Sequence, residues 1–403
     1  MSVVWILEAA YESAGSMKIG ITCYPTYGGS GAVATELGLE LARNGHEVHF
    51  ISYAQPFRLT QFKDGVYFHE VKPNQYPLFE YPPYSLALAV TMHEVVRREE
   101  LDLLHVHYAL PHATAGWIAR DMLRASGQDV KLVTTLHGTD ITLVGQDPSY
   151  WSIVRFSIEK SDRLTAVSSW LCDRTYQDFQ CEQSAIDVIP NFVDPDVYDR
   201  DRYAGKHVLG SPDERIVMHI SNFRRVKRIP DVIKIFHRVQ SELPARLVLV
   251  GDGPERQAAE DLAQRLGISD RVVILGKIES VAELLASADL FLLPSEQESF
   301  GLVALEAQAS GVPVIGSAHT GLAEVIEDGV TGSLHAVGDV DAMAEAGIAL
   351  LTDKDRWTAA SLASRAWAVE NFATSRVVPK YEKLYRDVLG LSQPDDTLGS
   401  DAS

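Results

Sequence analysis

Short apolar runs alternate with helical repeats of apolar residues along the chain. The first run covers 18–23 and is followed by 32–44, whose apolar residues recur every three or four positions. Gly45 then marks a helix stop before the next apolar run, 46–51. This order of strand, helix and strand predicts a βαβ unit.

The same alternation continues to residue 316 and predicts an α/β fold with doubly wound parallel sheets. Strands that are apolar throughout lie in sheets covered on both faces, and such sheets bind ligands beyond the carboxyl ends of their strands. Further strands are predicted at 103–107, 131–135, 216–220, 246–250, 271–275, 289–293 and 312–316, with helices at 230–242 and 255–266. A break near 189–191 separates two sheets, so a ligand pocket is expected in a cleft between two domains.

The chain is long enough for two domains with short extensions at both ends. The predicted layout is 1–16 as an extension, 17–189 as an N-terminal Rossmann-like domain, 190–370 as a C-terminal one, 371–389 as a helix crossing back to the N-terminal domain, and 390–403 as a disordered tail. Met17 is an alternative start. Residues 1–16 lack a basic segment and acids interrupt their apolar run, so no secretion or stable membrane insertion is expected, and the location is expected to be cytoplasmic.

Composition restricts the partners. The 403 residues carry 55 Asp and Glu against 36 Lys and Arg, a formal charge of −19. Surfaces that bind nucleic acid or anionic membranes are basic, so both partners are excluded and an anionic ligand needs a local basic site. The three cysteines are an odd number without metal-type spacing, which suits a reducing compartment. A homodimer is left open.

The first candidate for chemistry is the glycine-rich turn Gly28-Gly29-Ser30-Gly31, between a predicted strand and helix. Bare backbone N–H groups at a helix N-terminus bind anions, although a tight structural turn has the same sequence. The turn also matches a relaxed dinucleotide fingerprint, which would indicate a dehydrogenase. That fingerprint requires an acid at the end of the next strand, and 51–55 contains none.

Two charged groups follow strands of the second predicted sheet. Residues 224–228 form a basic cluster, which is either a solvated face or a phosphate site. Glu298 and Glu306 lie eight positions apart across a turn into a helix that begins near Gly301. Their carboxylates either accept from ligand hydroxyls or serve as an ordinary helix-terminal acid and a surface Glu.

No metal is expected. The Asp-x-Asp strings 194–196 and 339–341 do not end a predicted core strand. His105 and His107 share one strand face with His112 nearby, but a third ligand with zinc-type spacing is missing. We therefore interpret His107 as a strand-end side chain lining the cleft, with a packed or solvated histidine as the alternative.

These features together resemble the retaining family-4 glycosyltransferases over residues 17 to about 389. The resemblance rests on the glycine turn 28–31, the segments 135–140, 190–194 and 251–254, Lys227, and the Glu298/Glu306 pair. The segments 23–26, 68–71, 81–84, 105–108 and 221–224 resemble the branch of this family that acts in bacillithiol biosynthesis.

The resemblance implies a GT-B enzyme that moves N-acetylglucosamine from UDP-GlcNAc to the 2-hydroxyl of L-malate with retention and without a cofactor. Lys227 and Arg224 would neutralise the leaving diphosphate, Glu298 would bind the donor sugar and His137 would lie at the reacting centre. The implied donor-binding residues are Gly28, Gly29, Gly253, Ser299, Phe300, Gly301, Leu302 and Glu306. The implied acceptor-binding residues are Ser30, Tyr108, Thr135 and Arg155, the last also readable as an exposed helical arginine. No side-chain base is implied, because the leaving diphosphate takes the proton.

One position departs from the family pattern. Asn222 stands where many members carry an arginine, so the phosphate cation would come from Arg224 or Arg225. The alternatives left open are another acceptor such as inositol phosphate, a UDP-GlcNAc 2-epimerase and a non-catalytic sensor of nucleotide sugars.

Overall fold

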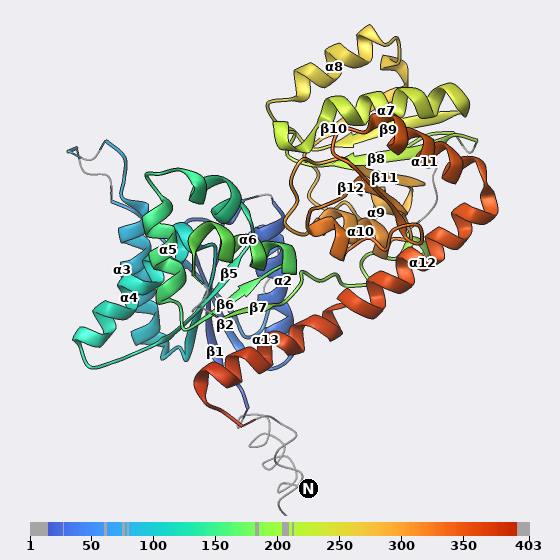
Figure 1. Ribbon diagram of the computed structural model, residues 1–403. Helices are drawn as coiled ribbons and strands as arrows, with labels where there is room; N and C mark the ends of the chain where they lie inside the picture. Colours follow the sequence, from blue (N-terminus) through green and yellow to red (C-terminus); the bar gives the residue numbers. More distant parts are fainter. Residues whose placement is uncertain are drawn as a thin grey trace, which may run out of the picture. The chain divides into compact units, whose positions relative to one another are not determined.

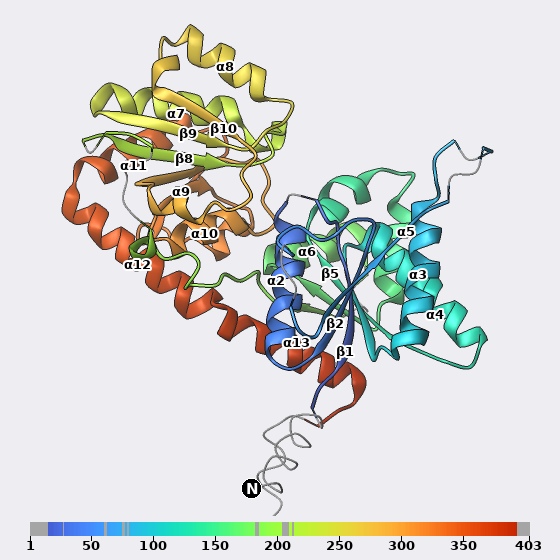
Figure 2. The ribbon, with the colours of Figure 1, turned by 180° about the vertical axis from the view of Figure 1, so that it is seen from behind.

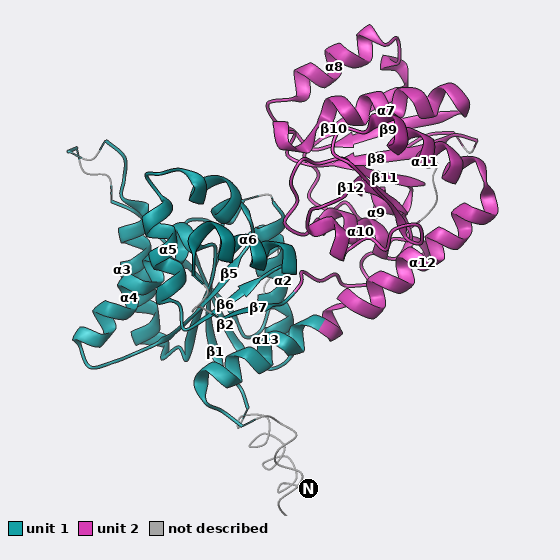
Figure 3. Cartoon of the chain, viewed as in Figure 1, with its two compact units in different colours: residues 1–189, 377–403 teal, residues 190–376 magenta. Residues whose placement is uncertain are grey.

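A computed structural model describes residues 15–26, 28–59, 63–74, 77–78, 80–181, 185–203, 209–211 and 213–392. The greater part of the predicted extension 1–16 and of the predicted tail 390–403 lies outside these residues. The described chain divides into two compact units, 1–189 with 377–403, and 190–376 (Figure 3). Each unit is a parallel α/β sheet, and each is described by itself.

In the first unit, the described strands form a seven-stranded parallel sheet in the order β3-β2-β1-β4-β5-β6-β7 (Figure 1). The strands are β1 (Lys18–Thr22), β2 (Glu47–Ser52), β3 (Val66–Glu70), β4 (Leu103–His107), β5 (Lys131–Leu136), β6 (Arg163–Ala166) and β7 (Ile186–Val188). The helices are α2 (Gly29–Arg43), α3 (Tyr84–Glu99), α4 (Thr114–Ala125), α5 (Trp151–Lys160), α6 (Ser169–Phe179) and α13 (Thr374–Leu389), which begins in the second unit. The order reverses between β1 and β4, the place where such sheets bind ligands.

Side-chain alternation along β4 separates the two faces of this sheet. Leu104 and Val106 pack in one core cluster with α3 and α4. His105 points to the opposite face, because its Nδ1 lies 2.7 Å from the hydroxyl of Tyr385 on α13. Helix α2 covers that same face, and Figure 2 shows α2 and α13 beside each other. Helices therefore cover both faces, as the apolar strands predict.

In the second unit, the described strands form a six-stranded parallel sheet in the order β10-β9-β8-β11-β12-β13. The strands are β8 (Arg215–Ile220), β9 (Ala245–Val250), β10 (Val272–Gly276), β11 (Leu290–Leu293), β12 (Val314–Ser317) and β13 (Gly332–His335). The helices are α7 (Ile229–Glu242), α8 (Arg256–Arg265), α9 (Ala282–Ala286), α10 (Leu302–Ala309), α11 (Val340–Thr352) and α12 (Lys354–Phe372). Its order reverses between β8 and β11, so the loops after these two strands are the candidate ligand loops.

Candidate functional site

The glycine turn after β1 leads directly into helix α2. The helix begins at Gly29 without a side-chain cap and without an acid in its first turn. A Cβ on Gly31 would lie 2.5 Å from the carbonyl oxygen of Tyr24, so a close backbone approach requires this glycine. Gly28 has open space instead. Among the described residues, no side chain caps the first backbone N–H groups of α2.

Ser30, Tyr108 and His137 lie together at the ends of β1, β4 and β5. The Tyr108 hydroxyl donates to Oγ of Ser30 at 2.9 Å, and the Tyr108 ring centroid is 5.2 Å from that of His137. Burial raises the pKa of Tyr108 to about 12, so its phenol stays protonated at neutral pH. Two residues predicted to bind the acceptor substrate, Ser30 and Tyr108, therefore contact each other beside His137, the histidine predicted at the reacting centre.

Asp140 fixes the turn that carries His137. Its carboxylate accepts from the backbone N–H groups of Ala109 and Gly138, both at 2.9 Å, and from that of His137 at 3.3 Å. It is 2% exposed, and burial raises its pKa to about 6. Asp140 belongs to the segment 135–140 that carries the family resemblance, but no role was predicted for it from the sequence. The carboxylate ties the turn after β5 to the chain after β4.

Two interpretations of buried strand residues need correction. The Thr135 side chain is fully buried, and its hydroxyl bonds His105 at 2.7 Å and Thr165 at 2.6 Å, so it supports the sheet rather than facing an acceptor. His107 is also fully buried and lines no open surface. Alternation along a strand predicts which face a side chain takes but not the depth at which it ends.

Arg155 lies on α5 and contacts two residues of the same helix. Its Nε donates to Glu159 at 2.9 Å and its guanidinium stacks 5.6 Å from the Trp151 ring. This is the pairing of an exposed helical arginine, the alternative to an acceptor role. The bond to Glu159 uses Nε, so an acceptor carboxylate could still bind through the Nη groups of Arg155.

Buried contacts shape the loop after β8 in the second unit. His219 Nδ1 donates to the carbonyl of Leu292 at 2.8 Å, and its Nε2 lies 2.8 Å from Oγ of Ser221, which accepts from Phe223 N–H. A Cβ on Gly251 would lie 1.8 Å from the Ser221 carbonyl oxygen, and one on Gly253 2.1 Å from that of Asn222. Both glycines thus let the loops after β8 and β9 pack backbone to backbone.

The His219 contacts predict a pH-dependent stability. Burial lowers the pKa of His219 to about 4, whereas in the unfolded chain it titrates near 6.5. Between these values only the unfolded chain binds the proton, so the free energy of unfolding falls as the pH is lowered from about 6.5 to 4. Denaturant titrations at several pH values give the slope of the free energy of unfolding against pH. In His219→Asn, which keeps an N–H donor, this slope should be smaller by about 1.4 kcal/mol per pH unit. Equal slopes would show that His219 does not stay neutral in the folded protein.

Lys227 and Glu298 meet at the carboxyl ends of β8 and β11. The backbone N–H of Glu296 donates to the Val226 carbonyl at 2.8 Å and joins the two loops. Lys227 Nζ then forms an ion pair with Glu298, whose Oε1 also accepts from Ser295 at 3.0 Å. The side chains are 21% and 11% exposed, so the pair is largely shielded from water. The structure thus brings together two residues to which the family resemblance assigns the diphosphate and the donor sugar.

The other cations of the 224–228 cluster differ in their surroundings. Arg228 pairs with Asp231 at the start of α7. Arg224 and Arg225 are exposed, and within the described chain no acid pairs with either. Both are therefore available to an anion, and the structure does not distinguish which one replaces the missing arginine at Asn222.

A tight turn carries Ser299, Phe300 and Gly301 into helix α10. Gly301 has a φ of +92°, and Leu302 begins the helix. A Cβ on Gly321 would lie 2.2 Å from the Ser299 carbonyl oxygen, and Gly321 N–H donates to the Glu298 carbonyl at 2.7 Å. Gly321, which sequence reasoning missed, therefore holds this turn in place.

Glu306 is buried inside α10 with a tyrosine partner. The Tyr198 hydroxyl donates to Oε1 of Glu306 at 2.6 Å, and each residue is 5% exposed. The two residues are 108 positions apart, so no local signal indicates the contact. Tyr198 fixes the orientation of the carboxylate predicted to bind the ribose.

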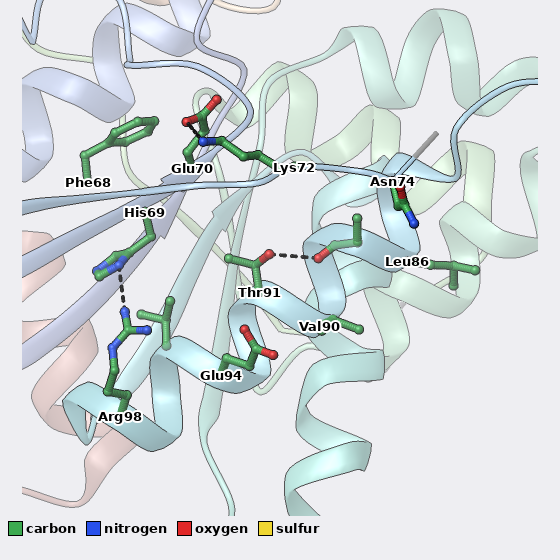
Figure 4. Close-up of a pocket in the computed structure, with 12 residues that line it drawn as sticks. Phe68, His69, Glu70, Lys72, Asn74, Leu86, Val90, Thr91, Glu94 and Arg98 are labelled. Carbon is green, nitrogen blue, oxygen red and sulfur yellow. Dashed lines mark hydrogen bonds and ion pairs between the residues drawn. The ribbon is translucent and has the colours of Figure 1, made fainter. Parts of the chain in front are cut away.

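A separate open pocket of about 700 Å³ lies between β3 and α3 (Figure 4). His69 accepts from Arg98 at 3.1 Å, and Lys72 pairs with Glu70 at its rim. None of the predicted site residues lines this pocket. It lies beside β3, the edge strand of the first sheet, and β2 stands between this strand and β1 in the sheet.

The two Asp-x-Asp strings have structural contacts. Asp194 accepts from the N–H of Asp196 at 2.9 Å, and Asp339 caps α11 through the N–H of Ala342 at 3.0 Å. Within the part of the chain that the structure describes, no three His, Cys, Asp or Glu side chains group as a metal site. The same residues contain no helix long and apolar enough to cross a bilayer.

Comparison with known proteins identifies the family. The model "Glycosyltransferase Family 4" matches residues 27–197, and "Glycosyl transferases group 1" matches 203–367. N-acetyl-alpha-D-glucosaminyl L-malate synthase of Bacillus anthracis is 50% identical over 375 residues, which cover 93% of this chain and 97% of that protein. The chain belongs to the family-4 glycosyltransferases. It is therefore a glycosyltransferase enzyme, as the sequence predicts.

Other relatives agree with this family and its fold. D-inositol 3-phosphate glycosyltransferase of Mycobacterium avium is 31% identical over 89% of this chain and 90% of its own. Sucrose-phosphate synthase from Thermosynechococcus elongatus matches with a TM-score of 0.78 at 21% identity, over 93% of this chain and 100% of that one. Anabaena HepE, solved with UDP and glucose, matches with a TM-score of 0.72 at 22% identity, over 91% and 99%. The GT-B fold predicted from the sequence is thereby confirmed.

Proposed function

We propose that this enzyme transfers N-acetylglucosamine from UDP-GlcNAc to the 2-hydroxyl of L-malate with retention, giving GlcNAc-malate and UDP as the first step of bacillithiol biosynthesis. The observation that carries the proposal is the 50% identity to the Bacillus anthracis malate synthase over nearly the full length of both chains. The inositol 3-phosphate relative reaches 31%. The identity therefore favours malate over inositol phosphate as the acceptor.

The chemical step depends on stabilising the diphosphate as it leaves. In this proposal the Lys227 ammonium and Arg224 bind the diphosphate oxygens, and the backbone around Phe300, Gly301 and Leu302 adds N–H donors. The ion pair with Glu298 supports this role because it holds the ammonium in place between two loops. These cations and N–H donors are proposed to stabilise the developing diphosphate charge in place of a metal ion.

Carboxylates bind the hydroxyls of the donor. Glu306 is proposed to accept from the ribose hydroxyls and Glu298 from the 3-hydroxyl of the sugar. The hydrogen bond from Tyr198 supports the first assignment, since it fixes one carboxylate oxygen of Glu306. Gly253 and Ser299 are proposed to let backbone approach the nucleotide closely, as are Gly28 and Gly29.

The acceptor needs hydrogen-bond donors because malate carries two carboxylates. Ser30, Tyr108 and the N–H groups at the N-terminus of α2 are proposed to supply them, with Arg155 as a further cation. The malate hydroxyl attacks the anomeric carbon on the face from which the diphosphate leaves, and its proton passes to a diphosphate oxygen. No protein base is proposed.

A UDP-release assay tests the acceptor. With UDP-GlcNAc as donor, L-malate should give UDP, whereas D-malate, succinate and inositol phosphate should each release less than about a tenth as much, since each misplaces or lacks a binding group. Release with inositol phosphate but not L-malate would overturn the proposed acceptor. UDP release without any acceptor would favour an epimerase-like reaction, and its absence with every acceptor would favour a nucleotide-sugar sensor.

The setting of the enzyme is also part of the proposal. A cytoplasmic location is supported by Cys23, Cys172 and Cys181, which are buried and not joined in disulfides. Homodimer formation stays a prediction.

A further inference from the structure

Buried histidines form a chain of contacts beneath His137. His107 on β4 is fully buried, and its Nδ1 lies 2.8 Å from Nε2 of His137. The two rings are stacked with centroids 5.1 Å apart. Burial lowers the pKa of His107 well below its usual value and that of His137 to about 3, so both rings are neutral near pH 7. In a neutral pair one ring must donate and the other must accept.

The neighbouring His112 also has an unpaired ring nitrogen, and its protonation state follows from its other hydrogen bond. Its Nδ1 lies 2.5 Å from the carbonyl oxygen of His107. A carbonyl only accepts, so His112 carries its proton on Nδ1 and its Nε2 is a bare lone pair. That Nε2 is buried and has no hydrogen-bond partner among the described residues. The unpaired nitrogen of His112 is therefore an acceptor.

The same reasoning distinguishes two arrangements for His107, whose Nε2 is also buried without a partner in the described chain. If His137 donated its Nε2 proton, His107 would accept at Nδ1. The proton of His107 would then lie on its own Nε2, as a buried N–H with no acceptor. If His107 donates from Nδ1, only a lone pair is left unpaired. Orphaned buried N–H groups are rarer than under-satisfied acceptors, because losing a donor's bond to water carries a full desolvation cost.

We propose that His107 is a positioning residue that donates its Nδ1 proton to His137 Nε2 and so holds His137 in the tautomer with its proton on Nδ1. His137 is partly exposed, and its Nδ1 has no partner among the described residues. The ring therefore presents an N–H donor to a ligand oxygen. That oxygen belongs to the nucleotide sugar, an assignment that rests on the proposed transfer. With its proton on Nδ1 and its Nε2 bonded to His107, His137 cannot accept the malate proton.

Long-range ¹H–¹⁵N correlation spectra of ¹⁵N-histidine-labelled protein test the tautomer directly. The signals of the two rings are assigned with His107→Asn and His137→Asn. At pH 7 we expect protonated Nδ1 and unprotonated Nε2 in both His107 and His137. Protonated Nε2 in His137 would overturn the proposal. The spectra need no substrate, so their outcome is independent of whether L-malate is the acceptor.

Kinetics of matched variants test the consequence. His107→Leu removes the donor and should lower kcat by about 10- to 100-fold with little change in KM, while His107→Asn, which retains an N–H donor, should stay within about threefold of wild type. His49→Asn is the control, because His49 is a buried strand histidine of the same sheet that contacts His69 and Glu47 instead. It should keep wild-type kcat. Unchanged kcat and an unchanged His137 tautomer in His107→Leu would overturn the positioning role.

Discussion

Replacing Lys227 with alanine is expected to lower kcat by about 100- to 1,000-fold while UDP binding stays measurable. The proposed ammonium acts on charge that develops on the diphosphate as the bond breaks, and removing one such preorganised group has an effect of this size. A group that contributes mainly in the transition state lowers kcat more than it weakens binding. Steady-state UDP release and UDP titration calorimetry measure the two quantities.

The ion pair adds a second consequence. In Lys227→Ala, the Glu298 carboxylate keeps only its Ser295 contact among those described above, and it is 11% exposed. Thermal unfolding of Lys227→Ala and of Lys227→Ala/Glu298→Gln separates lost stability from lost chemistry. Lys234→Ala is the matched control, because Lys234 is an exposed lysine on α7 that lies 3.6 Å from Asp231. If Lys227→Ala kept kcat within about threefold of this control, Lys227 would not be the leaving-group cation.

Gly251→Ala is expected to destabilise the second unit by about 3 to 5 kcal/mol. Gly251 has a φ of +124°, and its new Cβ would lie 1.8 Å from the Ser221 carbonyl oxygen. The backbone must therefore shift exactly where the β8 and β9 loops pack. Urea unfolding followed by circular dichroism measures the change.

Gly267→Ala is the control for backbone conformation alone. Gly267 has a φ of +69° but no atom within 4 Å of the added Cβ. It should lose only about 1 kcal/mol. Equal losses in the two variants would show that backbone conformation, rather than the contact with the β8 loop, makes Gly251 necessary.

The buried central strands were predictable because their apolar runs are continuous. The predicted bounds 103–107 agree with β4, and most of the other predicted strands differ by one or two residues. The prediction also missed β6, an inner strand of only four residues. Strands β3, β7 and β13 were missed because they lie at sheet edges and most of their side chains are only half-buried. Without a covered face on both sides, such strands lack the apolar signal that identifies a core strand.

The site could be predicted only where its residues form local patterns. Glycine turns, the 224–228 cluster and the Glu298/Glu306 spacing are visible in the sequence, and the structure pairs Lys227 with Glu298. Tyr198 and His219 were missed because their partners lie far along the chain. Local spacing carries no information on such contacts. The family resemblance supplied the roles of individual residues, which no local pattern determines.

The net charge of −19 indicates which large partners the protein can bind, but not which small ligands. It argues against extended anionic partners, but the proposed substrates are themselves small anions. A few cations beside a parallel sheet's switch point are enough for a diphosphate. Total charge therefore bears on partners and not on the chemistry of the site.

The most direct measurement of the proposed reaction is the structure of its product. Enzyme is incubated with UDP-GlcNAc and ¹³C-labelled L-malate, and the product is examined by mass spectrometry and by the one-bond ¹³C–¹H coupling at the anomeric carbon. The proposal predicts an α-linked GlcNAc on the malate 2-hydroxyl, formed in equal amount to UDP. A β-linked product, or free GlcNAc without a malate adduct, would contradict it.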